Sequence, residues 1–335
     1  MECKKGFVKN IALTAQDDDA GRRLDRILRK ALPDFPLSAL HRALRKGQVL
    51  VNGRKGKGED RVSAGTLIEI PLAKTVTLPY QNKLPLHKQQ LDKTGILWEG
   101  EGLLIINKPA GLAVHVHAGA VFRDNLDNQV QEYFKGKLPA SLSFKPGPLH
   151  RLDKPTSGIV VFAFTLEAAR WFSTLLRERK IKKRYLAILE GKLKNKETWE
   201  DMLLRDKKAR KTLIARKDNG KKGLTMVTPL AWAKKSGADY TFARLDIVTG
   251  RNHQIRAQAA YHGYPLAEDK KYGGRNNEVC FDKSVCKGRG FFLHAAELEL
   301  PGETDINPNI PRIIKAPLPG KFAKTVQVLF NIEVF

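Results

Sequence analysis

One short stretch of the chain combines a carboxylate with several cations in a form that could carry out chemistry. Residues 149–158 read LHRLDKPTSG, which places Asp153 between Arg151 and Lys154 on a loop. Neighbouring cations favour the ionised form of a carboxylate, so Asp153 is a candidate nucleophile or base. A structural role stays open, in which Asp153 pairs with Arg151 or caps a turn, because structural ion pairs have the same signature.

Three other segments offer functional side chains. The apolar run 103–106 is followed by Asn-Lys-Pro-Ala-Gly, which predicts a turn that exposes Lys108. Residues 182–191 predict a strand with a cationic start, on which Tyr185 is either a core residue or a ring that faces a ligand. Residues 249–258 predict a turn that leads into a helix. Three basic side chains near the start of this helix could bind a phosphate or a buried carboxylate. These are Arg251, His253 and Arg256.

The bulk composition bounds the class of protein that presents these groups. The chain has 335 residues, 42% of them hydrophobic, which suits about two domains with packed cores. Lys+Arg 60 against Asp+Glu 35 gives a net charge of +25, which favours a nucleic-acid partner. Neither a polybasic block beside an apolar segment nor an apolar run of membrane-spanning length occurs, so we expect a cytoplasmic protein without a membrane partner.

Metal and disulfide chemistry have little support in the sequence. Cys3, Cys280 and Cys286 match no zinc or disulfide spacing, so we expect free thiols. His115 and His117 lack a third ligand nearby, and we therefore expect no metal site.

Residues 21–71 predict a small basic unit of two helices and a hairpin. Apolar residues recur with the helical period up to residue 32, and a second helix is expected from Ser38, as its cap, to Lys46. A strand from Val49 then enters an Asn-Gly turn. Four arginines are candidate phosphate contacts, namely Arg23, Arg26, Arg42 and Arg45. A merely solvated charged face is the alternative.

The rest of the chain divides by composition. Residues 1–20 are expected to be an N-terminal extension, and residues 72–95, with prolines among polar residues, an interdomain linker. Residues 96–335 mix strands with helices without regular βαβ alternation, which predicts an α+β domain with a largely antiparallel sheet.

Two parts of the chain resemble known families. Arg23-Leu24-Asp25 and the segment GQVLVNG at 47–53 resemble the S-four-type RNA-binding module. Four blocks, in family order, resemble the RluA family of pseudouridine synthases and most closely its RluC-like branch, which acts on large-subunit ribosomal RNA. The blocks are residues 104–111, 150–158, 183–191 and 249–256. Pro155 and Gln258 depart from the family pattern, which more often has an acidic residue and His there.

The resemblance implies a pseudouridine synthase fold behind a small α-L/S-four-type domain, and an isomerase that needs no cofactor. Asp153 would be the nucleophile, Arg256 would pair with its carboxylate, and Tyr185 would stack on a flipped base and assist removal of the carbon-5 proton. Arg151 would fill the vacated space, while Lys108, Arg251, His253 and the four N-terminal arginines would bind substrate. The implied partner is 23S ribosomal RNA or the assembling large subunit, without an obligate protein partner.

Three alternatives stay open at this point. The same chemistry could act on transfer RNA. The chain could be a non-catalytic RNA-binding protein of ribosome assembly. An RNA N-glycosidase could also use an Asp and a flipped base, and it would release free uracil.

Overall fold

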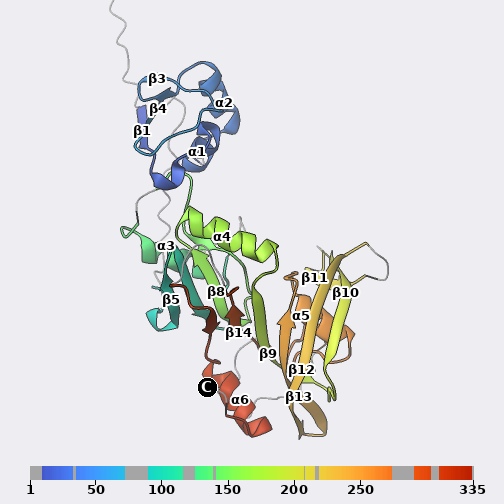
Figure 1. The fold of residues 1–335 in the computed structure, drawn as a ribbon. Helices are drawn as coiled ribbons and strands as arrows, with labels where there is room; N and C mark the ends of the chain where they lie inside the picture. The colour runs from blue at the N-terminus through green and yellow to red at the C-terminus, as the bar shows by residue number, and fades with distance from the viewer. Residues whose placement is uncertain are drawn as a thin grey trace, which may run out of the picture. The chain divides into compact units, whose positions relative to one another are not determined.

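The computed structural model describes residues 10–32, 35–71, 90–115, 125–138, 141–206, 208–215, 219–273, 290–302 and 309–333 (Figure 1). The chain forms two compact units. The first comprises Met1–Gln90, Gln129–Gly147 and Phe164–Glu167, and the second Leu91–Asn128, Pro148–Ala163 and Ala168–Phe335. The sequence predicts one domain over residues 96–335. In the structure, two segments of that range, Gln129–Gly147 and Phe164–Glu167, belong instead to the unit that contains the N-terminal residues.

The first unit contains a four-stranded sheet and two amphipathic helices. Its elements are β1 (Asn10–Thr14), α1 (Leu24–Ala31), α2 (Leu37–Arg45), β2 (Leu50–Val51), β3 (Arg54–Lys55) and β4 (Leu67–Pro71), with the strand order β1-β4-β2-β3. Leu24, Ile27 and Ile68 are fully buried in its core. Asn52 and Gly53 have φ values of 49° and 78°, the left-handed pair that a tight hairpin requires, so the predicted Asn-Gly turn is confirmed.

Two expectations for this unit need correction. The second helix begins at Leu37 after Pro36, whose fixed φ suits an N-cap position, and no side chain caps it, so the predicted Ser38 cap is wrong. The boundary at residue 20 cuts through the unit, because β1 pairs with β4. The buried Asp19 also accepts hydrogen bonds from the backbone N–H groups of Leu142 and Ser143, at 2.9 and 2.8 Å.

Several predicted features lie outside the described residues. These are residues 1–9 of the extension, residues 72–89 of the linker, His117, and the three cysteines. Within the part of the chain that is described, no helix is long and apolar enough to cross a membrane.

The second unit is built on one 11-stranded sheet. Its strands are β5 (Ile96–Gly100), β6 (Leu103–Lys108), β8 (Ser157–Ala163), β9 (Lys182–Glu190), β10 (Glu197–Asp206), β11 (Lys211–Ile214), β12 (Lys221–Lys235), β13 (Ala238–Ile247) and β14 (Leu293–Glu299), with β7 (Gly147–Pro148) on β8 and β15 (Ile313–Lys315) on β14. The order along the sheet is β11-β10-β12-β13-β9-β14-β8-β6-β5. The helices α5 (Gln254–Tyr261) and α6 (Gly320–Phe330) belong to this unit, while α3 (Leu126–Phe134) and α4 (Leu166–Arg177) each contain residues of both units.

Antiparallel pairing dominates this sheet, which confirms the predicted α+β class. The central pair β14 and β8 runs parallel and approaches closely at Gly158. A Cβ on Gly158, whose φ is 108°, would stand 2.3 Å from the carbonyl oxygen of Ala295. Only glycine fits both the backbone angle and the space, so this residue fixes where β8 and the loop before it lie.

Helix α5 packs against β10 and β11 and is held there partly by Gln258 (Figure 1). The Gln258 amide is fully buried, donates to the carbonyl oxygen of Trp199 at 2.9 Å and to Asp201 at 2.7 Å, and accepts from Thr225 at 2.7 Å. This departure from the family pattern therefore serves to fasten the helix that carries Arg256.

Candidate active site

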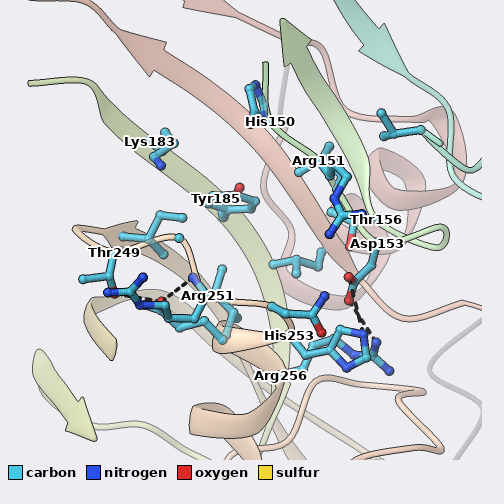
Figure 2. A pocket seen from close by; sticks show the side chains of 18 of the residues that line it. His150, Arg151, Asp153, Thr156, Lys183, Tyr185, Thr249, Arg251, His253 and Arg256 are labelled. Carbon is cyan, nitrogen blue, oxygen red and sulfur yellow. Dashed lines mark hydrogen bonds and ion pairs between the residues drawn. The ribbon is translucent and has the colours of Figure 1, made fainter. Parts of the chain in front are cut away.

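The loop that carries Asp153 is fixed at both ends by backbone hydrogen bonds. The N–H of Leu149 donates to the carbonyl oxygen of Val161 at 2.8 Å, and the N–H of Thr156 donates to that of Asp153 at 3.0 Å. Leu152 packs on the core of the sheet. The Asp153 carboxylate is directed into a cavity of about 1020 Å³ (Figure 2).

Lys108 is buried beneath this loop and donates hydrogen bonds to backbone carbonyl oxygens, one of them in the loop. It is the last residue of β6, is fully buried, and its ammonium donates to the carbonyl oxygens of Pro109 and Leu112 at 2.8 Å and of Lys154 at 3.3 Å. Burial lowers the pKa of Lys108 to about 7, against the opposing effect of the Asp153 charge. The predicted exposure of Lys108 is wrong because the strand continues past the apolar run and carries this residue under the loop.

Arg256 holds one oxygen of Asp153. Its Nη1 donates to Asp153 Oδ2 at 2.9 Å, while Nε and Nη2 donate to the two oxygens of the buried Asp269 at 2.7 and 2.8 Å. The guanidinium carbon lies 4.3 Å from the ring centre of Phe291 and 4.8 Å from that of Tyr272. Bidentate pairing and aromatic stacking fix the guanidinium plane in a way that an ammonium group could not reproduce.

His253 approaches the second oxygen of Asp153. It caps α5 in a left-handed conformation, with φ 51°, and its Nε2 lies 3.6 Å from Asp153 Oδ1. Its Nδ1 lies 2.8 Å from the hydroxyl of Tyr272, which accepts from the N–H of Thr212 at 2.7 Å. The Tyr272 proton is thus left to donate to Nδ1, which assigns the imidazole proton to Nε2, facing Asp153. Burial lowers the pKa of His253 to about 4, although the Asp153 charge opposes this, so the ring is neutral at neutral pH.

Tyr185 forms part of the wall contributed by β9 (Figure 2). Its side chain is 8% exposed, and its hydroxyl has no hydrogen-bond partner among the described residues. Burial, aided by the Asp153 charge, raises the pKa of Tyr185 well above its usual range. The neutral phenol can stack on a base or donate a hydrogen bond, but it is a poor proton acceptor.

The rim of the cavity is polar and cationic. Arg151 and Arg251 are exposed, and Nε of Arg251 donates to the carbonyl oxygen of Lys222 at 3.2 Å. His150 accepts from the N–H of Val161 at 3.2 Å, and burial, helped by the Lys183 charge, lowers the pKa of His150 to about 3. Asp153 is the one carboxylate among the described residues that line the cavity.

The structure brings most of the predicted site together. Six residues line the cavity, namely Arg151, Asp153, Tyr185, Arg251, His253 and Arg256. Arg23, Arg26, Arg42 and Arg45 belong to the other unit. Sequence reasoning missed Asp269 and Tyr272, whose stretch resembled only a Gly/Lys-rich loop. It also missed Lys183 as a residue that lines the cavity, although the basic residues at the start of β9 could have indicated it.

Metal binding finds no support in the described part of the chain. No group of three His, Cys, Asp or Glu side chains there could hold an ion. His115 instead lies 3.0 Å from Asp127, and so has a protein partner.

Comparison with known proteins gives a consistent result. Residues 102–261 match the family model described as RNA pseudouridylate synthase. The chain is 31% identical over 339 residues to the ribosomal large subunit pseudouridine synthase C of Salmonella typhimurium, covering 99% of this chain and 100% of that protein. It is 32% identical over 341 residues to the protein of the same name from Escherichia coli K12, covering 99% of each. The solved structure of human RNA pseudouridylate synthase domain containing 4 shares the fold, with a TM-score of 0.54 and 22% identity, over 70% of this chain and 92% of that one.

Proposed function

Because the chain belongs to the RNA pseudouridylate synthase family, and is therefore an isomerase, we propose that it converts specific uridines of large-subunit ribosomal RNA into pseudouridine with Asp153 as the nucleophile. The ribosomal substrate is supported by the names of relatives that match 99% of the chain. The observation that carries the catalytic assignment is the 2.9 Å pairing of Asp153 with Arg256 at the wall of the cavity.

The two oxygens of Asp153 have different surroundings, and this suits a nucleophile. Arg256 occupies Oδ2, which keeps the carboxylate ionised and oriented. Oδ1 faces the Nε2–H of His253 at the longer distance of 3.6 Å and is the oxygen we assign to attack, on either the base or the anomeric carbon. The bond between N1 and the anomeric carbon breaks, the uracil turns, and a bond forms between carbon-5 and the anomeric carbon. Carbon-5 loses one proton and N1 gains one, so the product is an isomer of the substrate and no group is transferred from a cofactor.

The proton that leaves carbon-5 needs a base. A neutral Tyr185 is a poor acceptor, and His253 offers no free lone pair, because its Nδ1 is occupied by the Tyr272 hydroxyl and its Nε2 carries the ring proton. We assign the proton to the released Asp153 carboxylate, the one carboxylate among the described lining residues. Tyr185 then serves as a stacking surface for the base. This narrows the role expected from the sequence, in which Tyr185 also assists proton removal.

The target nucleotide must leave its stack to enter the cavity, at a cost of a few kcal/mol. The exposed Arg151 is placed on the rim, where it can occupy the vacated position. Phosphate contacts from cationic side chains offset the cost of extrusion. We include Arg251 among these contacts.

The N-terminal residues 21–71 are proposed as an S-four-type RNA-binding module. Arg26, Arg42 and Arg45 are exposed and have no side-chain partner among the described residues, whereas Arg23 pairs with Asp25 at 2.7 Å. The proposal includes action in the cytoplasm on 23S RNA or the assembling large subunit, without metal, membrane or obligate protein partner.

The test maps pseudouridine across total RNA from cells that lack the protein, complemented with wild type or with Asp153→Asn. We expect specific large-subunit positions to lose the modification and to regain it with wild type alone. The purified variant should be slower by more than about 10⁴-fold, because a nucleophile is removed while the fold is kept.

Other outcomes identify the alternatives. Lost modification in transfer RNA alone would replace the ribosomal substrate. Release of free uracil by wild type would indicate glycosidase chemistry. Restoration of the modified positions by Asp153→Asn, at wild-type rates in the purified protein, would refute the nucleophile.

A further inference from the structure

A second groove, of about 510 Å³, adjoins the active-site cavity. Arg179, Lys183, Ile247 and Val248 line both spaces, so the groove meets the cavity where β9 begins and β13 ends. Arg184 and Asp246 line the groove and alternate with Lys183 and Ile247 along their strands, so the groove runs from this meeting point along the other face of the sheet. It is formed by β9, β10, β12 and β13 and extends to Lys196, the residue before β10. The groove thus offers a path away from the position of the reacting nucleotide.

The cations that line this groove fall into two classes. One class is neutralised by carboxylates: Lys182 lies 2.9 Å from Glu299, and Arg184 and Arg244 each lie 3.1 Å from Asp246. The other class has no side-chain partner among the described residues and consists of Arg179, Lys183 and Lys196. Only the second class has its charge available for a ligand.

Lys183 is the most informative member of this class. Its side chain is half-buried beside Tyr185, in the wall of the cavity (Figure 2). Its Nζ lies 3.5 Å from where a side chain on Gly250 would begin, and burial lowers the pKa of Lys183. A desolvated ammonium without a carboxylate is costly, so this arrangement is expected where an anion arrives from outside.

We propose that the RNA strand on one side of the target uridine leaves the cavity between Arg179 and Lys183 and follows the groove to Lys196. The ligand is the phosphodiester backbone of single-stranded RNA, and its successive phosphates face the three unpaired cations. A nucleotide in the cavity is covalently joined to its neighbours, so the strand requires an exit lined by available positive charge. This inference rests on the proposed function for its substrate class.

The groove predicts opposite effects on stability and binding for Lys183→Met. In the free protein the depressed pKa means that the charged form of Lys183 opposes folding at neutral pH, so removing the charge raises the melting temperature. The same change removes a phosphate contact and weakens RNA binding. A lysine needed only for structure would lower the melting temperature when replaced.

The experiment measures the Kd of the full chain for single-stranded oligouridylate over a salt series. We expect Lys183→Met and Lys196→Met each to raise Kd about fivefold and to lower the slope of log Kd against log salt by about 0.7. Lys194→Met is the matched control, because Lys194 is exposed in the same connection between β9 and β10 as Lys196 but lines neither space. Effects equal to those of the control, or a lower melting temperature for Lys183→Met, would overturn the proposal.

Truncated RNA then tests the path. With a substrate that wild type modifies, shortening one end should abolish the effect of Lys196→Met, and shortening the other should leave it intact. Persistence of the effect with both truncated substrates, or its loss with both of them, would exclude a single strand path. The oligouridylate measurement does not depend on which RNA is modified, so absence of ribosomal modification would refute the proposed function without deciding this inference.

Discussion

Two basic regions of the chain use arginine in opposite ways. In the cavity, Arg256 is 8% exposed at its side chain and makes three charge-assisted hydrogen bonds to Asp153 and Asp269. In the first unit, Arg26 and Arg42 are exposed and have no side-chain partner among the described residues. The first kind of arginine acts through geometry, because its position determines where one carboxylate lies. The second kind contributes only its positive charge, and this contribution does not require the side chain to be held in one position.

This difference predicts unequal responses to the same substitutions. Removing a fixed group changes the orientation of its partners and leaves them unpaired in a buried place. Removing an exposed cation costs one screened contact and little else. Substitutions in the cavity should therefore lower the rate of the chemical step, whereas substitutions in the first unit should lower the affinity for RNA.

Arg256→Lys should have the largest effect on the rate after loss of the nucleophile. A lysine cannot donate to Asp153 while also making the paired hydrogen bonds to Asp269, so kcat is expected to fall by at least about 10²-fold. Single-turnover rates and the melting temperature of the same preparation check this. Arg42→Lys, the same change at an exposed site, is the control and should leave kcat unaltered. Equal rates for the two variants would contradict a geometric role for Arg256.

Tyr272→Phe should have a smaller effect, which depends on pH. Without the Tyr272 hydroxyl, Nδ1 of His253 has no donor, so the ring can carry its proton there and turn a lone pair towards Asp153. We expect kcat to fall about tenfold with KM unchanged, since one orienting hydrogen bond is lost.

The sign of the pH dependence follows from the same tautomer. In wild type the pKa of His253 is lowered to about 4, so its charge does not change near neutrality. In the variant, protonation restores an N–H on Nε2, and activity should rise as the pH falls through the new pKa of His253. The charged groups that act on this ring are Asp153, Arg256, Arg205 and Lys271. A pH profile parallel to that of wild type would remove His253 from the positioning of Asp153.

The sequence predicted the parts of the site that local patterns carry. The local pattern predicted the strand that holds Tyr185, and the family resemblance implied the pairing of Asp153 with Arg256; the structure contains both. Asp269 follows Arg256 by 13 residues and meets it only because the chain returns after α5. No periodicity or turn signal predicts that contact, and the local sequence is rich in Gly and Lys, as surface loops are.

Lys108 shows the opposite failure, in which a local pattern misled. A lysine before Pro is typical of an exposed turn, yet β6 pairs with β8 as far as Lys108 and Gly158. The burial of Lys108 depends on the loop that passes above it and offers the carbonyl oxygen of Lys154. Such a tertiary contact outweighs the composition of the turn.

The smallest predicted effects concern the first unit. Arg26→Gln, Arg42→Gln and Arg45→Gln should each raise KM only about two- to fivefold at unchanged kcat, and the triple variant should raise KM further because each change removes one cation that can contact phosphate. Steady-state rates over a salt series measure this, and each substitution should lower the salt slope by up to about one.

Arg23→Gln is the internal control for that series. The ion pair of Arg23 with Asp25, at 2.7 Å, already offsets its charge, so it should raise KM less than the three unpaired arginines do. If the triple variant instead lowers kcat at saturating RNA, the unit acts on the chemistry as well as on binding. The division between orienting and merely charged arginines would then fail, because exposed arginines that belong to the other unit would be setting the rate of the reaction at Asp153.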